Sequence, residues 1–139
     1  MADEATNIVL LGNKGDPVEY TIAVGAAIAK GSVMKLANPK TVVISASGGI
    51  MAGILAEEKT ATDEKTKVAC LTHCICDLTC GAAETAVLGE PVIMGAAANE
   101  IDVQTSDTIE TSTLVVGVSL ETIGNNGTGA VLVNVGRVR

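Results

Sequence analysis

Short blocks of apolar residues alternate with short polar blocks along the whole chain. The clearest unit consists of an apolar run at 50–57, a polar loop at 58–66 and a second apolar run at 67–78. Two apolar runs joined by a polar loop are typical of neighbouring antiparallel β-strands. The pattern therefore predicts a strand pair, in which the second strand, 67–78, is unusually long.

The second half of the chain repeats this arrangement. The run 114–121 also contains an interior glycine and ends in a glutamate. A turn rich in glycine and asparagine, 124–129, then leads into the apolar run 130–135. Gly53 and Gly117 are 64 residues apart (117 − 53), and the terminal glutamates of the two runs have the same separation.

A further pair of similar segments, 31–36 and 89–94, lies 58 residues apart (89 − 31). The change of offset indicates that the two copies differ in loop length. The sequence thus predicts two pseudo-repeated halves, near 24–80 and 82–138. Two copies are too few for a solenoid, which needs about three repeats to bury its faces. We therefore expect the halves to close on one another as a single small β-barrel or sandwich.

Composition strengthens the all-β prediction. Of the 139 residues, 15 are glycine, none is phenylalanine or tryptophan, and one is tyrosine. The core must therefore consist mainly of aliphatic side chains, and the β-branched share favours short strands with tight turns. Only 22–30 and 82–88 could form helix, and each is short. Further strands are predicted at 18–22, 32–36, 41–44, 92–94 and 101–105.

The first 16 residues are predicted to form a flexible arm on a body that spans 17–139. The arm contains one apolar tetrad, Ile8, Val9, Leu10 and Leu11, and a strong turn signal follows it. One interpretation is a disordered tail, which is the commoner state of a terminus. The other is a docking segment, because four consecutive apolar residues favour burial against a partner or a sheet edge.

Charge excludes some classes of partner. The formal net charge is −7, and nucleic-acid binding needs a basic surface to neutralise phosphates, so no nucleic acid is expected. No apolar run approaches the roughly 20 residues of a membrane span, so no membrane is expected either. The N-terminus is acidic and polar, unlike a signal peptide. We therefore expect a soluble protein made in the cytoplasm.

Four cysteines, Cys70, Cys74, Cys76 and Cys80, surround the single histidine, His73. All four have even numbers, so on an unbroken strand they would share one face while His73 points to the other. Structural zinc sites wrap the metal with Cys-x2-Cys turns, which this spacing does not provide, so no metal is expected. The simplest interpretation is packing in a core or against a partner. An oxidised form that links symmetry-related chains outside the cell stays open.

Other candidate sites are weak. A catalytic pair of Cys74 and His73 needs both groups within hydrogen-bond reach, and adjacent strand residues face apart. Glu57 and Glu121 hold equivalent places in the two halves, but strand-end carboxylates are more often a solvated rim than a catalytic pair. The turn 124–129 has no phosphate-loop lysine. We expect no active site and no cofactor, and a structural or binding module is favoured over an enzyme.

Seven short segments form an ordered series along the chain: 18–22, 28–34, 52–57, 68–78, 88–92, 116–121 and 129–133. This series, which spans about residues 17–138, resembles the capsid cement, or head decoration, proteins of tailed bacteriophages. The resemblance implies a β-barrel or β-tulip body without a catalytic motif. Such a body binds the major capsid protein on the outer surface of an assembled shell, often as a homotrimer, and stabilises the shell.

On this resemblance the protein belongs to the virion and is made in the host cytoplasm. The tetrad from Ile8 to Leu11 becomes the candidate capsid contact. The four cysteines are a departure from the family pattern, and they leave open a cross-link in this chain. The alternative is an extracellular or surface β-module that binds glycan or assembles into fibres. Glycan sites usually present aromatic faces, and the chain offers only Tyr20.

Overall fold

The computed structural model describes residues 6–7, 17–46, 49–104 and 114–135. All regular structure in these ranges is β-strand, which confirms the all-β prediction; 22–30 and 82–88 contribute only turns and single bridges. None of the described ranges contains a helix that could span a membrane. The strands are β1 Thr6–Asn7, β2 Val18–Thr21, β3 Val33–Asn38, β4 Thr41–Ile44, β5 Met51–Leu55, β6 Lys67–Leu71, β7 His73–Cys80, β8 Pro91–Met94, β9 Glu100–Val103, β10 Gly117–Ser119 and β11 Thr128–Asn134.

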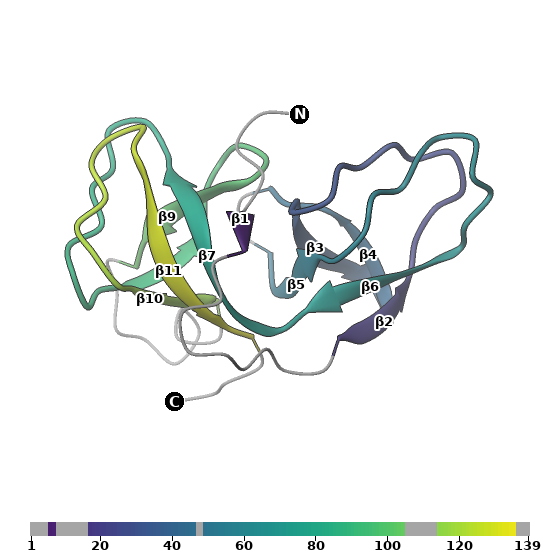
Figure 1. Ribbon diagram of the computed structural model, residues 1–139, viewed down its shortest axis with the longest axis horizontal. Helices are drawn as coiled ribbons and strands as arrows, with labels where there is room; N and C mark the ends of the chain where they lie inside the picture. Colours follow the sequence, from purple (N-terminus) through teal and green to yellow (C-terminus); the bar gives the residue numbers. More distant parts are fainter. Residues whose placement is uncertain (1–5, 8–16, 47–48, 105–113, 136–139) are drawn as a thin grey trace.

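The strands form two closed barrels that lie side by side (Figure 1). In the first barrel the order is β2-β4-β3-β5-β6, and β2 closes the ring by pairing with β6. In the second the order is β7-β9-β8-β10-β11, and β7 closes it by pairing with β11. The expectation that both halves close together as one barrel is therefore wrong. Each half closes on itself, because the first strand of the half pairs with the third strand on one edge and with the fifth strand on the other.

The two barrels are copies of one topology, which confirms the pseudo-repeat. Each also contains one isolated bridge, Ile28 with Lys59 in the first barrel and Ala86 with Ile123 in the second. These bridges are related by offsets of 58 (86 − 28) and 64 (123 − 59), the same offsets that relate the repeated sequence segments.

The chain passes from one barrel to the other at Thr72. The predicted single strand 67–78 is two strands, β6 and β7, which belong to different barrels. The closed units consequently run from β2 to β6 and from β7 to β11, rather than over 24–80 and 82–138. The apolar run gives no sign of this break because both strands are largely buried.

Two equivalent glycines allow neighbouring strands to approach closely. A Cβ on Gly53 would lie 2.5 Å from the carbonyl oxygen of Leu71, and Gly53 has a φ of +146°. A Cβ on Gly117 would collide with the carbonyl oxygen of Leu132. The repeated glycine in the sequence therefore reflects one requirement of the barrel, a close contact between the fourth and fifth strands of each copy.

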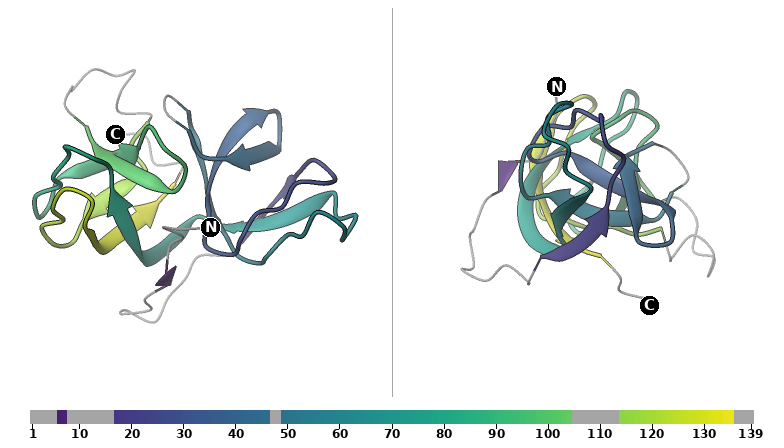
Figure 2. Two further views of the ribbon diagram at one scale, coloured as in Figure 1. Left: turned by 90° about the horizontal axis from the view of Figure 1, so that it is seen from above. Right: turned by 90° about the vertical axis from the view of Figure 1, so that its right-hand side faces the viewer.

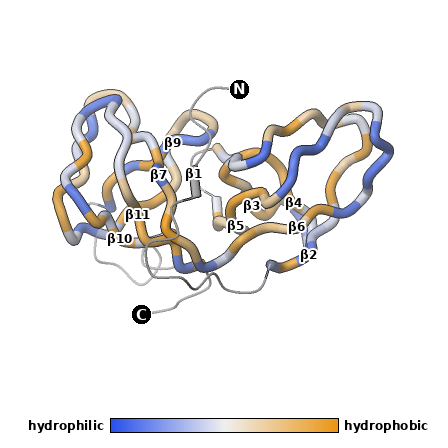
Figure 3. The backbone as a smooth tube through the Cα atoms, in the orientation of Figure 1, coloured by the Kyte–Doolittle hydropathy of each residue, from blue (hydrophilic) through white to orange (hydrophobic). Residues whose placement is uncertain are grey.

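Buried side chains form two cores. The first fills the first barrel and consists of Ile22, Ile28, Met34, Val42, Ala52, Leu55, Val68 and Cys70. The second fills the second barrel and extends onto the outer face of the first through Val33, Met51, Ile54 and Leu71. All five positions of β5 are buried: Met51 and Ile54 face the second core, Ala52 and Leu55 face the first, and Gly53 lies between them, where the register with β3 shifts. Hydrophobic stretches accordingly continue through β3 and β5, where the barrels meet (Figure 3).

A buried asparagine adds a polar link between the barrels. Asn99 lies in the turn between β8 and β9, has no exposed surface and has a φ of 65°. Its Oδ1 accepts a hydrogen bond of 2.9 Å from the Val33 N–H, and its own N–H donates one of 2.9 Å to Ser45 Oγ. Together with the shared core, these bonds fix the second barrel against the first in the elongated arrangement of Figure 2.

Candidate functional site

The N-terminal segment adds to the edge of the second barrel. β1 pairs antiparallel with β7 through Thr6 opposite Asp77 and Asn7 opposite Cys76. β11 follows the other edge of β7 over nearly its whole length, so β1 and β9 share this edge. The arm therefore acts, in its described part, as an added strand outside both closed rings (Figure 1).

The predicted contact residues Ile8, Val9, Leu10 and Leu11 lie outside the described residues. Their role as a docking tetrad stays a prediction. What the structure adds is their place in the chain: they directly follow a strand that already pairs by backbone hydrogen bonds with a sheet edge.

The four cysteines are core residues, and the structure gives them as thiols rather than disulfides. Cys74, Cys76 and Cys80 face the second core, whereas Cys70 belongs to the first. The expectation of one shared face is correct for the last three and wrong for Cys70, because the strand breaks at Thr72. His73 is exposed, on the opposite side of β7 from its neighbour Cys74, as predicted.

Burial makes these thiols poor nucleophiles and poor cross-linkers. It raises the pKa of Cys70 to about 12, and burial is also the main cause of the raised pKa of Cys80. Because the thiolate is the reactive form, neither group favours catalysis at neutral pH. The Sγ atoms of Cys74 and Cys76 lie 3.1 Å apart inside the core. At exposures of 3% or less, no cysteine is placed to reach a neighbouring chain.

No group of three or more histidine, cysteine or acidic side chains that could hold a metal occurs among the described residues. Glu57 and Glu121 are both exposed and belong to different barrels. The Oε2 atom of Glu57 lies 3.7 Å from Nζ of Lys65. That arrangement fits the solvated rim expected for them. A hydrogen bond with Asp102, reinforced by that residue's negative charge, raises the pKa of Glu84.

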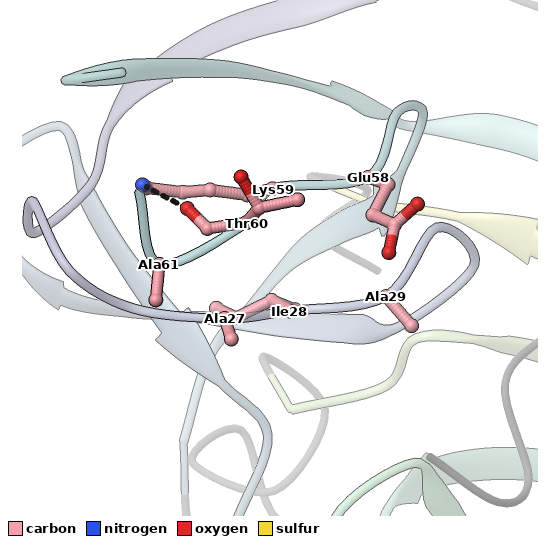
Figure 4. A pocket seen from close by; sticks show the side chains of 7 residues that line it. All are labelled: Ala27, Ile28, Ala29, Glu58, Lys59, Thr60 and Ala61. Atoms are coloured by element: carbon pink, nitrogen blue, oxygen red, sulfur yellow. Dashed lines mark hydrogen bonds between the residues drawn. The ribbon is translucent and has the colours of Figure 1, made fainter. Parts of the chain in front are cut away.

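A buried lysine, which the pattern of apolar and polar residues does not predict, lines a hollow on the first barrel. The hollow has a volume of about 290 Å³ and lies between the bridge strand at 27–29 and the loop at 58–61 (Figure 4). The Lys59 side chain is fully buried there. Its ammonium donates to Asp63 Oδ1 at 2.9 Å and to the Thr60 carbonyl at 3.3 Å.

Asp63 organises the loop around this lysine. Its carboxylate also accepts hydrogen bonds from the backbone N–H groups of Thr60 and Lys65. These bonds, with the bond to Lys59 foremost, lower the pKa of Asp63 to about 2. The other ionisable side chain that lines the hollow, Glu58, is exposed. Because the ammonium is already ion-paired to Asp63, this arrangement favours a structural role over catalysis.

The repeat offset could have revealed this buried lysine. Lys59 is equivalent to Ile123, which lies in the second core with 1% exposure. A lysine that aligns with a core isoleucine is expected to be buried and to need a carboxylate nearby. Asn99 gave no comparable signal, since its partners Val33 and Ser45 are distant in sequence.

No family model matches this chain, and no curated protein sequence matches it significantly. Among the described residues, the acidic groups are on the surface, the thiols are buried and the one buried cation is paired. The features left for function are surfaces, namely the N-terminal strand on β7 and the outer faces of the two barrels.

Proposed function

We propose that this protein is a non-enzymatic structural virion protein that binds the outer surface of an assembled phage capsid and stabilises it. The observation that carries the proposal is the N-terminal segment, whose described part adds to β7 as a strand outside two self-contained barrels. A segment that the barrels do not need for closure is available for contacts with another protein. The major capsid protein is the proposed partner.

The proposed mechanism is thermodynamic. A ligand that binds the assembled shell but not its separated subunits stabilises the shell by mass action, in proportion to the logarithm of its concentration relative to Kd. Each shell offers many equivalent sites, so the modest binding free energies of the individual contacts add up over the whole shell. Strand addition suits this role because main-chain hydrogen bonds contribute affinity while alternate side chains enter pockets on the partner.

Charge supports an outer rather than an inner location. With a net charge of −7, the protein would be repelled by packaged nucleic acid. We also propose that the protein acts as a homotrimer on the capsid. The resemblance to decoration proteins supports both points, and two closed barrels give the proposed trimer defined surfaces on which to pack.

A glycan-binding role has less support. Tyr20, the single aromatic residue, is partly buried, and its hydroxyl donates a 3.5 Å hydrogen bond to the Ala52 carbonyl. Burial and this bond raise the energetic cost of turning the ring outward as a stacking platform for a sugar.

Calorimetry of empty expanded shells, with and without the protein, tests the proposal. We expect saturating protein to raise the temperature at which the shells disrupt, because binding stabilises the assembled state. Bovine serum albumin at equal concentration controls for unspecific protection. Unchanged disruption at an occupancy shown to be saturating, or no binding at all, would contradict the proposal.

A further inference from the structure

The outer face of the first barrel carries an apolar row that the second barrel covers. Val33, Ile54 and Leu71 lie opposite one another across β3, β5 and β6. Their exposures are 0%, 0% and 6%, and all three belong to the core of the second barrel. The second copy of the repeat therefore packs on the first copy at this row.

The second barrel has the same row, and within the described residues no further barrel covers it. Pro91, Val118 and Leu132 lie opposite one another across β8, β10 and β11, in the same relation as the first row. All three are only partly buried. Leu120, two residues beyond Val118, is 37% exposed. An apolar surface that is fully buried in one copy is thus accessible in the other.

The turn that covers the first row also has a counterpart. Asn99 precedes β9, and Lys40 holds the equivalent place before β4; both have positive φ, at 65° and 54°. Asn99 is buried against Val33, whereas Lys40 is exposed. The first barrel therefore has an unused copy of the turn, just as the second barrel has an uncovered copy of the row.

The local chemistry of the second row agrees with this pairing. In the first row the Val33 N–H needs an acceptor and obtains one from Asn99. The equivalent residue, Pro91, has no N–H, so a turn seated there does not have to supply an acceptor. Lysine, which can only donate, is therefore compatible at the position that asparagine fills within the chain.

Charge is divided unequally between the two barrels. Residues 17–71 contain six lysines and five carboxylates, for a formal charge of +1. Residues 73–135 contain eight carboxylates and no lysine or arginine, for a formal charge of −8. A second barrel therefore repels another second barrel but not a first barrel, which favours contacts between unlike ends.

We propose that the apolar row of the second barrel, Pro91, Val118 and Leu132, seats the first barrel of a second copy through the turn that carries Lys40. The contact is head to tail and repeats, between chains, the packing of the two barrels within one chain. Such heterologous contacts form a ring when the rotation between copies closes, as a homotrimer requires. This inference concerns self-association alone and does not depend on capsid binding.

Sedimentation velocity over a range of concentrations tests the contact. We expect the wild-type protein to self-associate. Val118→Lys should weaken association at least about tenfold, because it places a charge in an apolar contact. Lys40→Glu should weaken it because it brings a carboxylate to an acidic barrel. Val24→Lys is the matched control: Val24 is 59% exposed, and its equivalent, Ala82, is exposed within the chain rather than buried between the barrels.

Mixing the two weakened variants is the decisive experiment. Val118→Lys retains an intact turn, and Lys40→Glu retains an intact row, so a head-to-tail contact predicts that an equimolar mixture forms a dimer that neither variant forms alone. A two-fold contact between like faces would not be rescued in this way. Circular dichroism verifies folding, and Leu120→Lys replaces Val118→Lys if that variant unfolds.

Three results would overturn the inference. They are a wild-type protein that stays monomeric at every concentration, a row variant that associates normally, and a mixture that stays monomeric. None of these results bears on whether the protein stabilises shells, which calorimetry measures separately.

Discussion

At the scale of single residues, two asparagines show how backbone and side-chain requirements can be separated. Asn99 and Asn126 both have positive φ, at 65° and 55°. Asn99 is completely buried and its side chain pairs with the Val33 N–H, whereas Asn126 is exposed in the turn before β11. Glycine relieves the backbone constraint at either position, so it removes the side chain without adding strain.

We predict that Asn99→Gly destabilises the protein by about 1–3 kcal/mol, because it leaves the buried Val33 N–H without its acceptor. Asn126→Gly should leave stability almost unchanged. Urea unfolding of both variants beside the wild type measures the difference. Equal effects of the two substitutions would show that conformation at positive φ, and not the link between barrels, is what Asn99 supplies.

At the scale of elements, the loop between β5 and β6 depends on the ion pair between Lys59 and Asp63. In the second barrel an isoleucine occupies the position equivalent to Lys59. The ammonium of Lys59 is buried, so removing Asp63 leaves an unpaired charge. We predict that Asp63→Ala lowers the melting temperature by several degrees. Lys59→Ile should be nearly neutral or stabilising, because it restores the residue found at the equivalent position, Ile123.

In the double variant, Asp63→Ala should cost much less than it does alone, and thermal melts of all four proteins complete the cycle. Acid provides a second readout. The folded pKa of Asp63, about 2, lies below its unfolded value of 3.8, so its contribution is present above pH 3.8 and is lost as pH falls toward 2. The double variant should not show the loss of stability that protonation of Asp63 causes between pH 3.8 and pH 2. Additive effects of the two substitutions would contradict the pairing.

Much of the element pattern was predictable from the sequence, and the exceptions have physical causes. Repeated glycines and offsets identified the two copies because each barrel needs the same close strand contact at Gly53 and Gly117. The run 67–78 predicts one strand instead of two because alternation disappears where both faces of a strand are buried, so hydropathy does not mark the change of barrel at Thr72. The sequence does not predict the role of Asn99 for a different reason, since only the tertiary fold brings this residue to Val33.

At the scale of the whole molecule, the arrangement of the barrels determines what each surface can do. The apolar row on the outer face of the first barrel is buried against the second barrel. The second barrel has a formal charge of −8, and its strand β7 carries the edge with which β1 pairs. The molecule therefore has two unlike ends. The self-association proposed here through unlike ends and the shell binding proposed for the N-terminal segment use different surfaces, so the proposed trimer does not require the arm.

This separation leads to the prediction for the arm. Both barrels close without β1, which contributes a two-residue ladder on the edge of β7. We expect deletion of residues 1–12 to leave the body folded and able to self-associate, but to reduce shell occupancy sharply, because the deletion removes both β1 and the tetrad from Ile8 to Leu11. Deletion of residues 1–5 is the matched control, since it shortens the same end and retains both features. Co-sedimentation with shells measures occupancy, and circular dichroism with melting follows the fold. Unfolding of the longer truncation would make the arm part of the body, and undiminished occupancy would place the capsid contact on the barrels themselves.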